Sequence, residues 1–195
     1  MNAAIPIQIP RTLHCTEEQF IELVKANPDL RWELTAQREV IVMPPTGSET
    51  GNYNSELTTD LGTWNRRHKT GKVFDSSTGF RLPNGAIRFP DVAWIRNERW
   101  EQLSPEQRQT FAPICPDFVV ELISPSDELT TVQAKMQEYL ENGCLLGWLI
   151  NPETRTVEIY RPNSPPEMVT FDTVLSGEDV LPGFTLDLRE IFGQS

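Results

Sequence analysis

Residues 118–123 read Phe-Val-Val-Glu-Leu-Ile, an apolar run interrupted only by Glu121. Such a run is typical of a central strand that is covered on both faces of its sheet. Strand alternation places Val119, Glu121 and Ile123 on one face. A buried, ionised carboxylate is costly unless it meets a cation or hydrogen-bond donors. Glu121 is therefore a candidate site residue; the alternative is a strand end at which it reaches water or pairs with an arginine.

The segments on either side of this run alternate between helical and strand patterns. Helical spacing and capping residues predict helices over 16–26, over 49–69, and from Ser126 or Asp127 to Asn142. Strand patterns cover 31–34, 40–43, 72–75, 79–82, 87–95, 145–151 and 156–160, and residues 98–111 form a polar, partly helical insertion. We expect an α/β (α+β) fold with a mixed central sheet flanked by helices, in a single domain over residues 1–195.

The composition is that of an ordinary globular protein, with 38% hydrophobic and 23% charged residues in a chain of 195. Cys15, Cys115 and Cys144 are far apart and odd in number, which predicts reduced thiols in the cytoplasm, without disulfides or a zinc site. No apolar run approaches the length of a bilayer span, and residues 1–13 lack the layout of a secretory signal. We expect neither a membrane partner nor secretion.

The formal net charge of −11 restricts how the chain can bind nucleic acid. Proteins that grip phosphates usually carry a basic excess, so DNA contact here depends on a local basic surface. One cluster is visible, and it consists of Arg66, Arg67, His68, Lys69 and Lys72. The alternative for this cluster is a solvated helix end, where cations complement the helix dipole.

Asp91 is the second candidate carboxylate, because it opens the apolar segment 92–95 directly after Pro90. An aspartate in this position is also common in turns. Asp117 competes with it, but the Cα atoms of Asp117 and Glu121 would lie about 13 Å apart along one strand. Ligand oxygens must approach Mg²⁺ to about 2.1 Å, so that pair cannot easily share an ion. Asp91 can share one with Glu121 if their strands are neighbours, about 4.8 Å apart. We therefore favour Asp91 and interpret Asp117 as structural.

Lys135 is the candidate cation of the site. The predicted helix that contains it carries an apolar stripe made of Leu129, Val132, Met136, Tyr139 and Leu140. Lys135 lies on the flank of this stripe, and Gln133 lies on the other flank. A lysine there can run its stem along the apolar face and bring its ammonium to a strand end. The alternative is an ordinary surface lysine.

These three residues suit one kind of chemistry. Two carboxylates can hold Mg²⁺ through oxygen. The ion polarises a phosphodiester and activates a water molecule, and a nearby lysine stabilises the charge that grows on the phosphate. Asp91, Glu121 and Lys135 therefore predict a metal-dependent hydrolase of phosphodiesters.

Several segments, in their order along the chain, resemble the Uma-two family of restriction-endonuclease-like proteins, within the PD-(D/E)XK nuclease superfamily. These segments are Arg31-Trp-Glu-Leu34, Phe89-Pro-Asp-Val-Ala-Trp-Ile95, Cys115-Pro-Asp-Phe-Val-Val-Glu-Leu-Ile-Ser-Pro-Ser126, Lys135-Met-Gln-Glu-Tyr139, Trp148-Leu-Ile-Asn-Pro152 and Leu175-Ser-Gly-Glu-Asp-Val-Leu-Pro-Gly-Phe184. The resemblance covers nearly the whole chain. It implies a restriction-endonuclease-like core, a mixed central sheet with helices on both sides.

The resemblance also implies roles for single residues. Asp91 matches the superfamily aspartate and Glu121 the glutamate that follows it. The superfamily lysine would stand at Ile123, and in this family Lys135 on the following helix matches it instead. Glu33 matches a family acidic position and is implied as a further metal-site residue, with Gln133 as an accessory candidate.

The function predicted from these observations is a Mg²⁺- or Mn²⁺-dependent endonuclease that hydrolyses DNA. A catalytically inactive nuclease-fold module that binds nucleic acid or protein is the alternative, motivated by the charge of −11 and by Ile123. A glycosidase with paired carboxylates ranks last, because Trp94 and Trp148 are better interpreted as core aromatics than as sugar platforms. A homodimer is expected because one active site cuts one strand.

Overall fold

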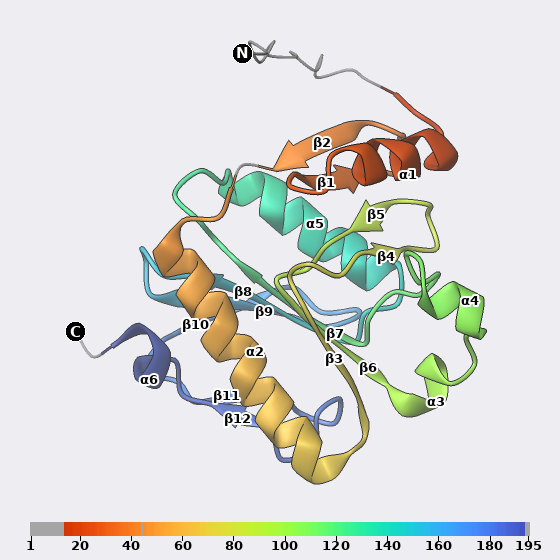
Figure 1. The fold of residues 1–195 in the computed structure, drawn as a ribbon. Helices are drawn as coiled ribbons and strands as arrows, with labels where there is room; N and C mark the ends of the chain where they lie inside the picture. The colour runs from red at the N-terminus through yellow and green to blue at the C-terminus, as the bar shows by residue number, and fades with distance from the viewer. Residues whose placement is uncertain (1–13, 44, 194–195) are drawn as a thin grey trace.

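A six-stranded mixed sheet forms the centre of the fold (Figure 1). The computed structural model describes residues 14–43 and 45–193. In order across the sheet, the strands are β10 (Glu167–Thr170), β9 (Thr156–Tyr160), β8 (Leu146–Asn151), β7 (Phe118–Leu122), β6 (Val92–Arg96) and β3 (Gly71–Asp75). β7 and β8 are parallel, and the other neighbours are antiparallel. The predicted mixed central sheet is confirmed, and the run at 118–123 lies in its interior.

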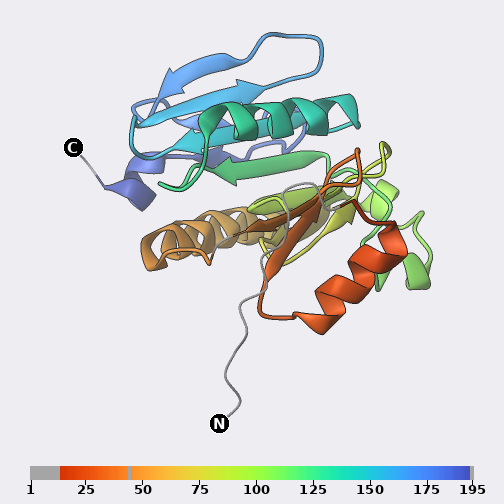
Figure 2. The same ribbon diagram turned by 90° about the horizontal axis from the view of Figure 1, so that it is seen from above.

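The two long helices, α2 (Ser48–His68) and α5 (Leu129–Glu141), cover opposite faces of this sheet (Figure 2). One core cluster joins α2 to alternate residues of β7, and it includes Leu57, Leu61, Trp64, Phe118, Val120 and Leu122. The other joins α5 to the residues between them, and it includes Val119, Met136, Tyr139 and Leu149, with Ile123 packed against it. The strand alternation predicted for residues 118–123 is therefore confirmed. Trp94 and Trp148 are both buried in the first cluster, as expected for core aromatics.

A smaller four-stranded sheet packs beside the main one. Its strands, in order, are β2 (Val40–Met43), β1 (Arg31–Leu34), β5 (Ile87–Arg88) and β4 (Phe80–Arg81). Helix α1 (Glu17–Ala26) covers it through Phe20, and the hydroxyl of Thr16 caps that helix as predicted. The remaining elements are α3 (Asn97–Trp100), α4 (Pro105–Arg108), the strand pair β11 (Leu175–Ser176) and β12 (Thr185–Leu186), and α6 (Leu188–Phe192).

The single strand predicted over residues 87–95 is wrong. The chain breaks at Phe89 and Pro90, and its two halves, β5 and β6, join different sheets. Pro90 has no backbone N–H to donate to a ladder, and its ring restricts the backbone of Phe89. The break places Asp91 at the point where the chain passes from the small sheet to the main sheet.

The predicted start of α5 is also wrong. The helix begins at Leu129 after Glu128, whose side chain makes no capping hydrogen bond. Asp127 instead accepts hydrogen bonds from the backbone N–H and the hydroxyl of Ser124, at 2.8 and 2.6 Å. Aspartate can bond to nearby backbone in this way as an alternative to capping a helix, and here the turn occupies the carboxylate.

Two further expectations concern the chain as a whole. The three cysteines, all within the described residues, are free and buried. Among residues 14–43 and 45–193, no helix combines the length and the apolar character that crossing a bilayer requires.

Candidate functional site

Glu121 lies on β7 in the middle of the main sheet and is buried. β6 and β7 run antiparallel with Val92 opposite Val120, so the position across from Glu121 is Asp91. The neighbouring-strand arrangement that a shared ion requires is therefore present. The Glu121 side chain points to the α5 face, where its Oε1 accepts a hydrogen bond of 3.0 Å from the hydroxyl of Tyr139.

Asp91 is partly buried and is held by two hydrogen-bond donors. The backbone N–H of Leu122 donates to its Oδ2, and the amide of Asn54 on α2 donates to its Oδ1, both at 2.9 Å. In the described part of the chain, no ion pair includes Asp91. Burial raises the pKa of the Asp91 carboxyl, because these donors and the more distant cations do not fully offset the loss of water.

Lys135 brings its ammonium to this end of the strands from α5. Its Nζ lies 2.9 Å from Oε1 of Glu121 and 2.7 Å from Oε1 of Glu33, and the side chain is 12% exposed. Burial opposes the charge of the ammonium, but the carboxylates of Glu121 and Glu33 outweigh burial and raise the pKa of Lys135. The predicted geometry, in which a lysine from the helix flank reaches the strands, is present.

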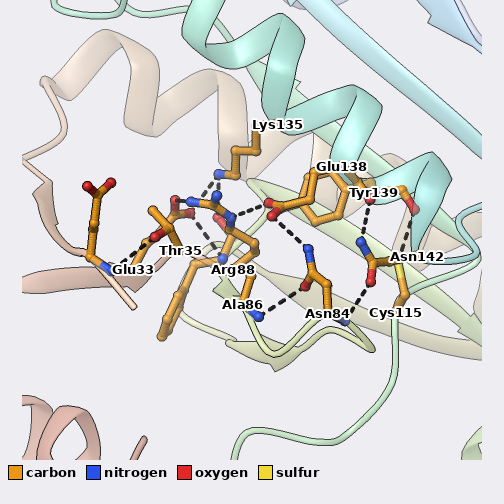
Figure 3. Close-up of polar contacts among 12 residues, drawn as sticks. Glu33, Thr35, Asn84, Ala86, Arg88, Cys115, Lys135, Glu138, Tyr139 and Asn142 are labelled. Atoms are coloured by element: carbon orange, nitrogen blue, oxygen red, sulfur yellow. Dashed lines mark hydrogen bonds and ion pairs between the residues drawn. The ribbon is translucent and has the colours of Figure 1, made fainter. Parts of the chain in front are cut away.

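Glu33 lies on β1 of the small sheet, and its carboxylate meets two cations. Besides Lys135, it contacts the guanidinium of Arg88 at 2.9 Å and accepts from the backbone N–H of Phe89 at 3.2 Å. Figure 3 shows the Glu33 carboxylate beside Arg88 and Lys135. Burial acts to raise the pKa of Glu33, but the charges of Lys135 and Arg88 outweigh it and lower that pKa.

The electrostatic balance is different at Glu121. Burial, reinforced by the negative charges of Asp91 and Glu33, raises the pKa of Glu121 to about 7, although Lys135 acts to lower it. Glu121 and Asp91 are thus carboxyls that bind a proton more tightly than in water. A cation placed between them would favour their ionised forms.

The donor set fits a divalent ion only in part. Within the described ranges, no three side chains from His, Cys, Asp and Glu are grouped so that they could hold a metal ion. Mg²⁺ in nucleic-acid and nucleotide enzymes commonly keeps several waters and takes one or two protein carboxylates together with substrate phosphate. Asp91 and Glu121, on facing positions of adjacent strands with raised pKa values, meet that lesser requirement.

Other residues singled out from the sequence lie elsewhere. Gln133 donates to Oε1 of Glu158 on β9 at 2.7 Å, and no described hydrogen bond joins it to Asp91 or Glu121. Asp117 is 1% exposed and forms ion pairs of 3.0 Å with Arg96 and Arg99, consistent with a structural role.

The predicted basic cluster lies at the far end of α2 from the candidate site. α2 touches Asp91 through Asn54, and from there the helix rises roughly 20 Å before it reaches Arg67. The side chains of the cluster are exposed at the C-terminal end of the helix and on the start of β3. This position agrees with the helix-end interpretation and leaves any role in DNA contact separate from Asp91 and Glu121.

Three residues that touch the site were not predicted from the sequence. The sequence pattern places Tyr139 on the apolar stripe of a helix, Arg88 in a strand and Asn54 in the helix predicted over 49–69, without a role at the site for any of them. A polar hydroxyl on an apolar stripe beside a buried glutamate was a usable signal for Tyr139. Nothing local indicated Asn54 or Arg88, because their partners are distant in the chain.

Comparisons with known proteins bear on the family and the fold of the chain. The family model Uma2, described as "Putative restriction endonuclease", matches residues 17–189. A crystal structure described as "a putative nuclease belonging to DUF820" from Anabaena variabilis aligns with a TM-score of 0.75 and 21% identity, over 90% of this chain and 96% of that one. At this identity the likeness shows the fold. No curated protein matches the chain. Because the family model spans most of its length, the chain belongs to the Uma2 family of restriction-endonuclease-like proteins.

Proposed function

We propose that this chain is a divalent-metal-dependent nuclease that hydrolyses phosphodiester bonds of DNA. The observation that carries the proposal is the register of β6 and β7, which places Asp91, at the start of β6, opposite Glu121, together with the contact between the ammonium of Lys135 and Glu121. The family description and the nuclease-like neighbour support the nucleic-acid substrate.

Asp91 and Glu121 are the residues that would hold Mg²⁺ or Mn²⁺. The chemistry such an ion supplies when bound is polarisation of the phosphodiester and activation of a water molecule. The protein holds both carboxylates in place before any substrate arrives: Leu122 and Asn54 fix Asp91, and Tyr139 fixes Glu121. Preorganised groups need no rearrangement during the reaction.

Lys135 would act on the substrate itself. Its largely buried ammonium lies beside the carboxylate pair, where it can neutralise the negative charge that develops on the phosphate. This is the role expected of the superfamily lysine, delivered here from α5 in place of the strand position that Ile123 occupies.

Plasmid nicking tests the proposal. The full chain is incubated with supercoiled DNA and Mg²⁺ or Mn²⁺, and calorimetry measures Mn²⁺ binding in parallel. We expect Asp91→Asn and Glu121→Gln to lower nicking by at least about 10²-fold. Glu141→Gln, an exposed carboxylate on α5, is the matched control and should retain activity. Wild-type protein that binds Mn²⁺ but leaves DNA intact would contradict the proposal.

One observation favours a second candidate, a nuclease-fold module that binds nucleic acid or protein without cutting. Ile123 stands where the superfamily lysine would, and Lys135 is already paired with both Glu33 and Glu121. DNA binding by wild-type protein without metal-dependent cleavage would favour this module.

A further inference from the structure

The contacts of Glu33 differ in kind from those of Asp91. We infer that Glu33 is a positioning residue that holds Lys135, not a metal ligand, and that the Arg88–Glu138 ion pair holds Glu33 in turn. The effect of Glu33 on catalysis rests on the proposed function. The positioning of the Lys135 ammonium by Glu33 can be tested without nuclease activity.

Both oxygens of Glu33 are already occupied by donors. Oε1 receives the ammonium of Lys135 at 2.7 Å and the N–H of Phe89 at 3.2 Å, and Oε2 receives the guanidinium of Arg88 at 2.9 Å. Glu33 is 3% exposed. A divalent ion approaching this carboxylate would meet two fixed cations, whereas an ion approaching Asp91 meets none in direct contact.

Arg88 is held from the opposite side by α5. Its Nε donates to Oε2 of Glu138 at 2.6 Å, and Asn84 donates to the other oxygen of Glu138 at 2.9 Å. The backbone N–H of Asn84 donates in turn to the side chain of Asn142 at 2.8 Å. Figure 3 shows this chain of contacts running from Asn142 through Asn84, Glu138 and Arg88 to Glu33.

Through these contacts, α5 helps to hold the side chain of its own residue Lys135 in place. Lys135 and Glu138 are three residues apart on α5 and therefore project from the same side of the helix. Glu138 forms an ion pair with Arg88, and Arg88 forms one with Glu33. Glu33 in turn forms an ion pair with Lys135, so the series of contacts returns to α5. This series of ion pairs connects α5 to the small sheet and, through Glu121, to the main sheet.

A long lysine side chain needs this second anchor. Its ammonium is a compact charge on a flexible four-carbon stem, which a single partner does not orient. Glu121 is the other partner, and Glu121 must also serve the metal in the proposed reaction. With Glu33 in place, the ammonium of Lys135 stays beside Glu121 even when the Glu121 carboxylate binds a metal ion.

The test uses Glu33→Gln, which keeps the shape of the side chain and removes its charge. The direct readout is the ¹H–¹⁵N correlation signal of the lysine ammonium, assigned to Lys135 by its absence in Lys135→Met. We expect this signal to shift or vanish in Glu33→Gln and to shift in Glu138→Gln. Mn²⁺ dissociation constants from calorimetry should stay within about threefold of wild type in both variants. The kcat should fall about 10- to 100-fold with KM little changed.

Glu141→Gln is the matched control, because it removes an exposed carboxylate from the same helix and should leave the ammonium signal, Mn²⁺ binding and kcat unchanged. Loss of Mn²⁺ binding in Glu33→Gln to the extent seen in Asp91→Asn would overturn the inference, as would an unchanged ammonium signal. If Glu33→Gln does not fold, Glu138→Gln carries the same test from the more exposed end of the network.

The two proposals fail in different ways. Wild-type protein without nuclease activity would count against the proposed function, while the ammonium signal would still decide the positioning of Lys135. Conversely, an active enzyme whose Mn²⁺ affinity depends on Glu33 would retain the nuclease proposal and reject the positioning role.

Discussion

The ammonium of Lys135 lies 2.9 Å from Oε1 of Glu121, an ion pair that joins α5 to the middle of the central sheet. The hydroxyl of Tyr139 donates to the same oxygen. Even with this cation and this donor, the pKa of Glu121 is raised to about 7, because burial and the nearby carboxylates outweigh them. Burial is the largest cause, so a further cation beside Glu121 would favour its ionised form.

Lys135→Met should separate metal binding from catalysis. Methionine fills a similar volume but removes the cation shared by Glu33 and Glu121. We expect the metal-free variant to lose about 3 kcal/mol of unfolding free energy, because a buried ion-pair partner is gone. Mn²⁺ affinity should be retained or increased, because a repelling charge is absent, while nicking is lost. Full nicking by this variant would exclude a catalytic role for Lys135.

Stability should depend on pH through Glu121. Burial raises the pKa of this carboxyl from 4.5 to about 7, so between these values the folded protein keeps a proton that the unfolded chain releases. The stability this group contributes is complete below pH 4.5 and is lost as pH rises through about 7. Wild type should therefore lose up to about 3 kcal/mol relative to Glu121→Gln across this window.

Urea denaturation of both proteins in EDTA, at several pH values, measures this difference. A difference that does not change with pH would contradict the raised pKa. Mn²⁺ affinity should show the opposite trend and increase over the same window, because the metal binds the ionised carboxylate and releases its proton.

Asp117→Asn should affect stability and leave the site intact. The carboxylate of Asp117 binds Arg96 and Arg99 and also accepts from the backbone N–H of Arg96. Removing its charge weakens the contacts to two arginines that are themselves about one-third exposed, and we expect a loss of about 1–2 kcal/mol in chemical denaturation. Mn²⁺ affinity should match wild type. A large loss of Mn²⁺ binding in folded Asp117→Asn would mean that Asp117, and not Asp91, is the aspartate of the metal site.

Gly71→Ala should destabilise the edge of the main sheet. A Cβ atom on Gly71 would collide with the indole of Trp94 and with the backbone carbonyl of Ile95, which cannot easily move. We expect a loss of about 1–3 kcal/mol from this overpacking. Gly62→Ala is the matched control: it meets open space on α2, and alanine there should stabilise the helix by about 0.5–1 kcal/mol. Thermal or urea unfolding of both variants distinguishes the two effects.

Much of the central sheet could be predicted from local pattern. The run around Glu121 implied an interior strand with alternating faces, and both features are confirmed. The choice of Asp91 over Asp117 required the strands of Asp91 and Glu121 to be neighbours, and β6 does lie beside β7. These inferences held because the spacing of side chains along and between strands is nearly constant.

The roles of residues whose partners are distant in the chain could not be predicted from the sequence. Pro90 was a visible break, but no local pattern indicates that the strands before and after it belong to different sheets. In the sequence, Arg88 and Glu138 are ordinary charged residues. Only the folded structure brings Nε of Arg88 to 2.6 Å from Oε2 of Glu138. The strands and their faces are encoded by periodicity between near neighbours. The charge network around Lys135 arises only when remote segments pack, because a buried charge is costly unless opposite charges or hydrogen-bond donors converge on it.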